Sequence, residues 1–596
     1  TVTEPHKKRY TDSNNNSRTI SISLVDTMLI SPNGTSLASL GDLHNVPKIN
    51  LPDGAIERMD LLLEEDPELF EGYAIRDAEI SARHAWYMAE FVSEYLGGNS
   101  PPITLGGLAE KHFLSLLQSS EMDLNDLLGI EEQKETKWNP RSNRYITKTK
   151  SVPLRLVHSH ETGASESYHG GRSEAYVFGF TKPDEWEDFD LAGAYTTAMV
   201  AIREPDWSNL RVVYSVSEFK EDELGFALIE FKFPPDTRFP CLPVRSENGL
   251  IFPLEGTTYA GSPEIVLATN MRAVLKIIEG VIVPWASEER PFRTFSADIK
   301  IKRDATKGSP TERAWKEIGN SLYGKLAQGI KEKRVFDSRE GASSILPPSK
   351  ITQPYLASYV TSLVRAVLGE LLNGVPKDKE VVSATTDGFI TNAKEDELNT
   401  SGPLCQLFSD LRMILSGNPS ILESKHMARI VLCWKTRGQI DGAPDVDATS
   451  IVAKAGIKIP TSKPFNAETD GFDPYSRFDD IDGFDEFQME KLGLAFWEPI
   501  GIDSAADSIH MAHLFLNRVS GQKYDNGRLI SMRKMFNNDA DMVSESVEQT
   551  LNMEYDWKRE LINPDQRAHN SEHFDDMAEH IFAETRPWKS VDEFNR

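Results

Sequence analysis

The order of hydrophobic and polar positions predicts a mixture of helices and strands in this chain. Residues 20–25 alternate between apolar and polar side chains, which is typical of a strand, and residues 77–95 carry apolar side chains at helical spacing. Short strands alternating with turns are expected between 150 and 235, and the Pro- and Gly-rich segment 233–262 indicates a β-rich insertion. A Pro-bounded loop leads to an amphipathic helix at 354–373. No internal repeat is visible.

Two positions carry sharper local information. After helices expected near 263–279 and 290–305, a third helix begins with Ser309-Pro-Thr-Glu312, which is a capping box with Pro at the first helical position. Further on, a β-run enters Asp387-Gly388, the dipeptide most typical of a tight hairpin, and leaves as an apolar strand. Such a hairpin would present one carboxylate at its tip, although taken alone an Asp-Gly pair is more often only a turn.

Length and charge limit the class of protein. A chain of 596 residues predicts three to five domains. Its net charge of −27 argues against a simple nucleic-acid-binding module, whose footprint is normally basic. It does not exclude an enzyme with a basic channel, because basic runs occur at 300–303, 331–334 and 141–150. The acidic runs of the last 150 residues are interpreted as solvated surface.

Cysteine usage and the chain start bear on the compartment. Cys241, Cys405 and Cys433 are scattered, without paired metal-ligand spacing, so a reduced cytoplasmic setting is expected. We also expect no membrane association, because by the sequence no apolar stretch is expected to reach the length of a membrane span. Since Thr1 is not an initiator Met, the chain is expected to be a fragment or a processed form.

The first block that carries chemistry surrounds Asp190. A strand ends at this residue, Gly193 permits a sharp turn, and a helix begins near Tyr195. An Asp at a strand end, followed by turn N–H groups, can hold a cation and a phosphate together. In isolation, however, an Asp that caps the helix is the favoured interpretation.

The second block is the helix that begins after Ser309. One of its faces combines two cations, an amide and an aromatic ring: Arg313, Lys316, Asn320 and Tyr323. The preceding helix contributes Arg303, and Lys307 follows in the bend, so the two helices form a hairpin with a basic lining. This face suits a triphosphate and a stacked base, whereas the alternative is a solvated cationic surface.

Together the blocks resemble motifs A, B and C of the family B DNA polymerases, in that order. The matching strings are Asp190-x-x-Gly-x-Tyr195, Lys316-x-x-x-Asn320-Ser-x-Tyr323-Gly324 and Thr385-Thr-Asp387. The likeness spans about 150–460 and is closest to the protein-primed branch, in particular to the primer-independent polymerases of the bacterial elements called pipolins. It implies an α/β (α+β) multidomain, right-hand fold with palm, fingers and thumb, plus an RNase H-like exonuclease remnant.

The resemblance assigns roles to these residues. Asp190, Asp387 and the Leu191 carbonyl would bind two Mg²⁺ ions, for which Mn²⁺ can substitute. Arg303, Lys307 and Lys316 would neutralise the triphosphate, Asn320 and Tyr323 would pack against the nascent base pair, and Tyr195 would exclude a ribose 2′-hydroxyl. Three departures from the family pattern are Thr385 where Asp is usual, Thr196 where Pro is usual and Gly193 where Ser is usual.

Weaker blocks resemble DNA-binding elements. Tyr168-His-Gly170-Gly171 is similar to the Tyr-x-Gly-Gly template-binding element, and an ordinary loop is the alternative. Lys435-Thr-Arg437-Gly438 stands where protein-primed relatives carry Lys-x-Tyr and looks like the pipolin version. Gly324 and Lys454 complete the expected DNA contacts. Near the start, Tyr73-x-x-x-Asp77 resembles the third exonuclease motif at a helix start, with a plain helix cap as the alternative.

These interpretations give a domain plan and a function. The expected units are an incomplete exonuclease-like domain (1–150), palm (151–202), insertion and palm (203–289), fingers hairpin (290–330), palm with insertion (331–440), and thumb with C-terminal extension (441–596). The expected function is template-directed DNA synthesis from dNTPs, started without a primer, with 3′–5′ exonuclease activity if upstream motifs exist. A protein-primed replicase that needs a terminal protein is the alternative; an inactive polymerase-like DNA-binding protein is the alternative of another class. The partners would be template DNA and primer-template duplex.

Overall fold

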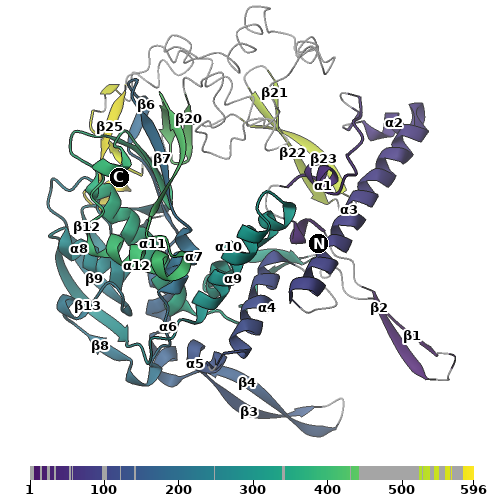
Figure 1. Cartoon of the computed structure of the whole chain (residues 1–596), viewed down its shortest axis with the longest axis horizontal. Helices are drawn as coiled ribbons and strands as arrows, with labels where there is room; N and C mark the ends of the chain where they lie inside the picture. The colour runs from purple at the N-terminus through teal and green to yellow at the C-terminus, as the bar shows by residue number, and fades with distance from the viewer. Residues whose placement is uncertain are drawn as a thin grey trace, which may run out of the picture.

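A computed structural model gives the fold of the chain (Figure 1). The residues that it describes are 6–11, 13, 16–22, 27–31, 35–52, 55–56, 58–96, 104–120, 122–139, 143–246, 249–337, 342–429, 431–441, 522–525, 528–536, 542–549, 558–563, 565–566 and 582–595. They form a multidomain α+β structure, as the sequence predicts.

Strands β18, β7, β17, β16 and β5, in this order, form a five-stranded antiparallel sheet, which we call the acid-bearing sheet. Its strands are β5 (Arg172–Ala175), β7 (Trp186–Leu191), β16 (Val381–Thr386), β17 (Gly388–Thr391) and β18 (Leu422–Ala428). The neighbours come from distant parts of the chain, so the sheet closes only when the tertiary fold forms. The helices α7 (Ala194–Val200), α11 (Pro354–Gly374) and α12 (Pro403–Ser416) pack against one another beside it.

Helix α11 is the core helix of the protein. Almost every side chain from Pro354 to Leu372 is buried, so the expected amphipathic pattern is wrong although the expected range is correct. By length and composition α11 could cross a membrane, which corrects the expectation that no stretch is long enough. Because 94% of its apolar window is buried inside the fold, packing against the protein accounts for its composition.

A second sheet, ordered β12-β9-β13-β8, packs on the far side of α11 and α6 (Arg155–Ser167). It contains β8 (Arg211–Val213), β9 (Leu224–Lys232), β12 (Glu255–Gly261) and β13 (Val274–Val283), with the short hairpin β10 (Val244–Ser246) and β11 (Gly249–Ile251) beside it. The β-rich character expected for residues 233–262 is therefore confirmed. The helix expected at 263–279 is wrong in its second half, since α8 (Ser262–Asn270) gives way to β13, and α6 stands where strands were expected. The helix expected to begin near Tyr195 is confirmed by α7, which begins at Ala194.

A third sheet, ordered β20-β19-β6-β25-β24, joins the end of the chain to its middle. Its strands are β6 (Val177–Phe180), β19 (Val431–Lys435), β20 (Gly438–Asp441), β24 (Glu560–Leu561) and β25 (Ala583–Arg586). Arg559, at the start of this returning segment, is only 2% exposed and faces the buried Glu174 carboxylate at 3.9 Å. The remaining C-terminal elements are β21 (Gln522–Asp525), β22 (Arg528–Phe536), β23 (Met542–Gln549) and α17 (Val591–Phe594).

The N-terminal region is helical, with two projecting hairpins (Figure 1). Its elements are β1 (His6–Thr11), β2 (Ser17–Ile22), α1 (Leu37–Leu43), α2 (Met59–Glu65), α3 (Pro67–Leu96), α4 (Leu105–Gln118), α5 (Leu124–Leu128), β3 (Ile130–Asn139) and β4 (Arg144–Pro153). Within the described part of residues 1–153, the strands pair only as β1–β2 and β3–β4. No exonuclease-type sheet is therefore seen in this part of the chain.

The helical hairpin of α9 (Pro291–Ala305) and α10 (Pro310–Ala327) forms as expected. The Ser309 hydroxyl accepts a hydrogen bond from the Glu312 N–H and so caps α10. The Glu312 carboxylate accepts from the N–H of Gly308, one residue before the position that a regular capping box uses. The connection from α10 to α11 contains a small hairpin formed by β14 (Arg334–Asp337) and β15 (Ala342–Ile345).

Candidate active site

The acid-bearing sheet places the two predicted acids on adjacent strands. Asp190, near the end of β7, stands opposite Gly388 in β17, and Asp387 occupies the turn just before Gly388. The backbone carbonyl of Asp387 accepts a hydrogen bond from the Leu191 N–H at 2.9 Å, so main-chain atoms tie the two acids together. The proximity that the resemblance requires therefore follows from strand register.

The turn differs in detail from the expected Asp-Gly turn. Thr385 pairs with Gly388, so the turn residues are Thr386 and Asp387, and it is Thr386 that has a positive φ of 64°. Gly388 already belongs to β17, and a Cβ there would lie 2.0 Å from Asp190 Oδ1. The glycine is needed because the Asp190 carboxylate lies directly over its backbone.

A cavity of about 660 Å³ opens in front of these acids. It collects most of the residues that the three motifs predict: Asp190, Leu191, Tyr195, Arg303, Lys316, Asn320, Tyr323 and Asp387. Carboxylates thus form one side and the cationic face of the helical hairpin the other. Segments more than a hundred residues apart in the chain meet here, as the motif hypothesis requires.

Two tyrosines lie together in the cavity. The rings of Tyr195 and Tyr323 stack with centroids 4.3 Å apart and planes inclined by 16°, and the Tyr168 and Tyr323 hydroxyls are 3.3 Å apart. Burial, reinforced by the Asp387 charge, raises the pKa of Tyr195, and burial also raises the pKa of Tyr323. Both hydroxyls are therefore neutral, and the pair forms a flat, protonated floor rather than an acid–base group.

The cations of the hairpin divide into two groups. Arg303 and Lys316 line the cavity, and Arg303 is only loosely held, 3.9 Å from Glu312. Lys302 points elsewhere: its ammonium is 2.7 Å from Asp298 and lies over the Trp315 ring. Two further cations do not line this cavity, since Lys307 is exposed in the bend and Arg313 lines a separate hollow against α1 and α3.

Sequence reasoning missed five charged residues of the cavity, one of which is Asp304 near the end of α9. Lys300 was noted only as part of a basic run, and Arg412 from α12 and the pair Glu423–Lys425 from β18 were not singled out. Glu423 stands directly opposite Asp190 on the neighbouring strand, which places a third carboxylate beside the two acids. Only pairing across the sheet reveals it, because β18 carries no local motif.

The predicted template-binding loop is held by buried polar contacts. The Arg365 guanidinium, 1% exposed, donates to the carbonyls of His169 and Gly170 at 2.7 and 2.9 Å. Burial, helped by the Arg365 charge, lowers the pKa of His169 to about 3, so this imidazole is neutral. A Cβ on Gly171 would lie 2.7 Å from Thr386 Cγ2, so the loop backbone contacts the acid-bearing turn directly.

The predicted initiation segment reaches the same turn from the third sheet. Arg437 lies between β19 and β20 with φ of 57°, and its guanidinium donates to the Thr386 hydroxyl at 3.2 Å. Lys435 ends β19 and pairs through its backbone with Gly438. The predicted Lys454 contact lies outside the described residues, and Gly324 is exposed on α10 with no atom within 4 Å of a Cβ built there.

The exonuclease candidates have local contacts. Tyr73 and Asp77 lie well inside α3 rather than at a helix start, which corrects that expectation. The Lys48 ammonium is 3.3 Å from the Asp77 carboxylate and 4.8 Å from the centre of the Tyr73 ring. Holding Lys48 against α3 accounts for both side chains.

The donors of the cavity fit an open site for a divalent cation, completed by a substrate, better than they fit a closed metal site. In the described residues, no group of three or more His, Cys, Asp or Glu side chains is arranged to hold a metal. Mg²⁺ in phosphoryl-transfer sites is usually held by one or two carboxylates plus substrate phosphates and water. Asp190 and Asp387 would supply the carboxylates of such a site. The phosphates of a substrate, paired with the cations across the cavity, would complete the coordination.

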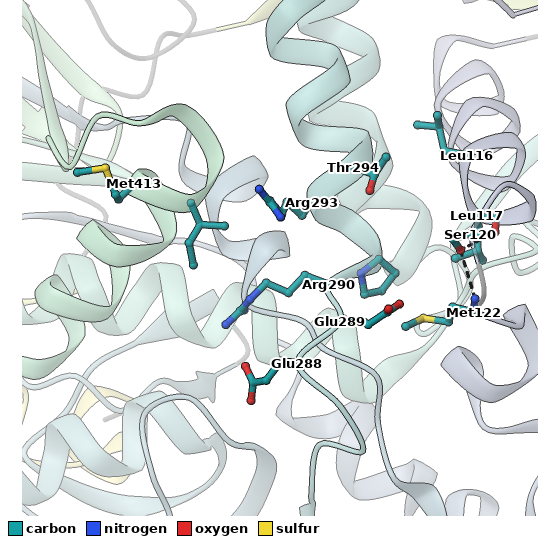
Figure 2. Close-up of a pocket in the computed structure, with 12 residues that line it drawn as sticks. Leu116, Leu117, Ser120, Met122, Glu288, Glu289, Arg290, Arg293, Thr294 and Met413 are labelled. Atoms are coloured by element: carbon teal, nitrogen blue, oxygen red, sulfur yellow. Dashed lines mark hydrogen bonds between the residues drawn. The ribbon is translucent and has the colours of Figure 1, made fainter.

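A second cavity, of about 590 Å³, lies where α4, the start of α9 and the end of α12 meet (Figure 2). Arg290 lines it and donates to the carbonyls of Val200 and Ala201 at 2.7 and 3.3 Å, which fastens the end of α7 to the start of α9. The lining contains Glu288 and Glu289 but no residue of the three motifs. It is therefore a junction between the sheet side and the helical hairpin.

Comparisons with known proteins give the following similarities. The family described as DNA polymerase type B, organellar and viral, matches residues 102–359. The chain is 36% identical, over 589 residues, to the Primer-independent DNA polymerase PolB of Escherichia coli. The aligned region covers 97% of this chain and 62% of that protein. The chain thus spans 62% of the length of this relative.

Among solved structures, the orthorhombic form of phi29 DNA polymerase is similar with a TM-score of 0.49 and 13% identity, covering 74% of this chain and 71% of that one. The family B DNA polymerase of Pyrobaculum calidifontis has a TM-score of 0.29 and 12% identity, covering 72% and 46%. The chain is thus similar to the type B DNA polymerases, by the family model over residues 102–359 and by the Escherichia coli relative over 97% of this chain's length.

Proposed function

We propose that this chain catalyses template-directed DNA synthesis from dNTPs by transfer of a nucleotidyl group. The observation that carries the proposal is the single cavity in which Asp190 and Asp387 face Arg303, Lys316 and the stacked tyrosines. Mg²⁺, as two ions held with the help of the Leu191 carbonyl, would supply charge neutralisation and activation of the attacking hydroxyl. Mn²⁺ would substitute for it.

The side chains would do the rest of the work by positioning. Arg303 and Lys316 would pair with the triphosphate, and Lys307 would add charge at the rim once substrate enters. Tyr323 and Asn320 would support the new base pair, and Tyr195 would lie under the sugar. Tyr168, Gly170 and Gly171 would contact the template, with Gly324 allowing close approach from α10.

The test is primer extension with a matched pair of variants. Asp387→Asn removes one carboxylate charge from the cavity and is expected to reduce the rate at least about a thousandfold, since metal-bound charge contributes several kcal/mol. Glu187→Gln removes the same charge from β7, three residues before Asp190, and is expected to leave the rate within about twofold. Near-normal extension by Asp387→Asn, with unchanged metal dependence, would refute the assignment.

We further propose that synthesis starts without a primer, as the name of the Escherichia coli relative states for that protein. The supporting contact is the hydrogen bond from Arg437 to Thr386, which fixes a guanidinium beside the acid-bearing turn. There it would stabilise the triphosphate of the first nucleotide, which an ordinary primer lacks. Lys435 and Gly438 would set the shape of this turn.

The assay uses circular single-stranded DNA with dNTPs and Mg²⁺ or Mn²⁺, without primer, ribonucleotides or terminal protein. New strands that begin with a 5′-triphosphate deoxynucleotide are expected. Arg437→Ala should reduce initiation more than elongation, whereas Arg429→Ala, just before β19, should reduce neither. If the protein extends primers well but starts strands only when a terminal protein is added, the protein-primed alternative holds.

A further inference from the structure

The ribbon of β3 and β4 projects from the body of the protein next to α5 (Figure 1). Its strands pair without a break from Ile130 opposite Pro153 to Asn139 opposite Arg144, so the ribbon is regular along its whole length. Nothing in the chemistry of the cavity uses it. An exposed two-stranded ribbon of this length is unusual unless its side chains have a partner.

The outer half of the ribbon is strongly basic although the protein is acidic. Residues 136–150 contain five basic side chains and no acidic one, in a chain whose net charge is −27: Lys137, Arg141, Arg144, Lys148 and Lys150. The acids of the ribbon, Glu131, Glu132 and Glu135, lie on β3 nearer its root. Glu135 stands opposite Lys148, and its carboxylate is 2.8 Å from the Lys137 ammonium, so part of the basic charge is paired within the ribbon. Local charge of this sign attracts a polyanion despite the overall charge.

The same half carries two exposed aromatic rings on one face. Trp138 and Tyr145 are direct cross-strand partners, 48% and 71% exposed, with ring centroids 5.1 Å apart in an edge-to-face arrangement. The next pair on that face, Thr136 and Thr147, joins its hydroxyls at 2.9 Å. Alternation along the strands puts Lys137 and Arg144 on the opposite face, so near the tip the rings lie on one face of the ribbon and these cations on the other.

The root of the ribbon is fixed to the core. Gly129, with φ of 62°, precedes β3, its carbonyl accepts from the Leu154 N–H at 2.8 Å, and a Cβ there would clash with the Trp207 ring at 2.9 Å. The side chain of Gln353, which caps α11, donates to the Leu128 carbonyl at 2.6 Å. The ribbon is thereby anchored to the helix that leads into β16 and Asp387.

We propose that the β3–β4 ribbon binds single-stranded DNA, with the Trp138–Tyr145 pair stacking on unpaired bases and the flanking cations contacting phosphates. Stacking platforms beside basic side chains are the common means of binding single strands without sequence preference. The proposal rests on the proposed function for the identity of the strand, because an enzyme that copies a template carries unpaired template near its site. A duplex would offer the rings no exposed base face.

The experiment measures equilibrium binding of the full 596-residue chain to fluorescent oligo(dT), at about 50 and about 200 mM salt. Trp138→Leu/Tyr145→Leu keeps an apolar cross-strand pair but removes both π-faces, so the hairpin is retained. We expect its Kd for oligo(dT) to rise about tenfold or more. The control is Trp86→Leu, with no change expected, because this tryptophan on α3 is even more exposed (70%) but donates a hydrogen bond to Glu90.

Two further variants separate the possible outcomes. Arg144→Gln should weaken binding most at low salt and reduce its salt dependence. Asp387→Asn should abolish synthesis without altering oligo(dT) binding, so failure of the ribbon proposal is distinguishable from failure of the proposed function. Unchanged oligo(dT) affinity in the double leucine variant, with an unchanged Tm, would overturn the proposal and leave the ribbon as a surface for a protein partner.

Discussion

The acid-bearing sheet and the helical hairpin of α9 and α10 bring opposite charges to one cavity by different means. In the sheet, Asp190 and Asp387 are placed by backbone register, and Gly388 is so close to Asp190 that no side chain fits there. In the hairpin, Arg303 and Lys316 reach the cavity through long side chains from helical surfaces. The two acids are therefore held by the backbone of paired strands, whereas the two cations can adjust to a ligand through their long side chains.

This difference matches the tasks that we propose. Metal ions need donors at fixed distances, which hydrogen-bonded strands provide. A triphosphate that enters and leaves needs charge that can follow it, which flexible cations on a hairpin provide. The comparison predicts that small backbone changes are severe in the sheet and mild in the hairpin.

The largest expected effect is a glycine substitution on each side. Gly388→Ala would put a methyl group 2.0 Å from Asp190 Oδ1, so we expect at least about a hundredfold loss of primer extension. Gly324→Ala meets nothing within 4 Å on α10 and should raise stability by about 1 kcal/mol. Extension rates and Tm of both variants check this prediction.

The same pair of variants also tests the Gly324 assignment. If DNA approaches the α10 backbone closely, Gly324→Ala should weaken primer-template binding severalfold while its Tm rises. Equal activity loss in the two variants would contradict the contrast between a rigid and an adaptable side.

The second expected effect concerns the tyrosine that joins the two sides. Tyr195 belongs to α7 beside the sheet but stacks on Tyr323 of α10. Tyr195→Ala removes the ring under the sugar, so the ratio of kcat/KM for rNTP over dNTP should rise about a hundredfold. Tyr195→Phe keeps the ring and should keep the selectivity; a low ratio in Tyr195→Ala would place the sugar gate elsewhere.

A smaller effect is expected from single cations of the hairpin. Lys316→Ala should raise KM for dNTP about tenfold, because one of several charges on the triphosphate is lost. Lys302→Ala is the matched control, since its ammonium is paired with Asp298 and covers Trp315; stability should fall slightly and KM should not change. Steady-state kinetics over a range of dNTP concentrations gives KM for both variants. An equal rise in KM for Lys316→Ala and Lys302→Ala would contradict a specific role of Lys316 in binding the triphosphate.

The smallest effect is a pH dependence on the sheet side. The pKa of His169 is about 3 in the folded protein and about 6.5 in the unfolded chain. Between about pH 3 and 6.5 the imidazole is therefore mostly neutral when folded and mostly protonated when unfolded. Its contribution to stability is complete above pH 6.5 and is lost as pH falls toward 3, by about 2 kcal/mol at pH 5. His169→Gln, which cannot titrate, should show a flatter decline of unfolding free energy between pH 7 and 5; identical slopes would exclude His169 as the cause.

Much of the site could be predicted from local sequence. The Ser309 cap, the cationic face of α10 and the Asp387 hairpin each depend on residues that are neighbours in the chain, and the structure contains all three. The strand expected at 20–25 overlaps β2 at residues 20–22, and its other positions lie outside the described residues; the helix expected at 77–95 lies within α3, which begins earlier. Local hydrogen bonding and side-chain spacing are sufficient to define such elements.

Other features depended on the tertiary fold. Glu423 enters the cavity only because β18 pairs with β7, and Arg559 becomes buried only because the end of the chain returns to β6. The stretch at 274–283 is a strand because β9 and β8 lie on either side of it, although its sequence suggested a helix. The sequence by itself determined the chemistry of the three motifs, since these are short strings of adjacent residues. Only the tertiary structure decided which distant strands pair, because cross-strand register brings together residues that no local pattern connects.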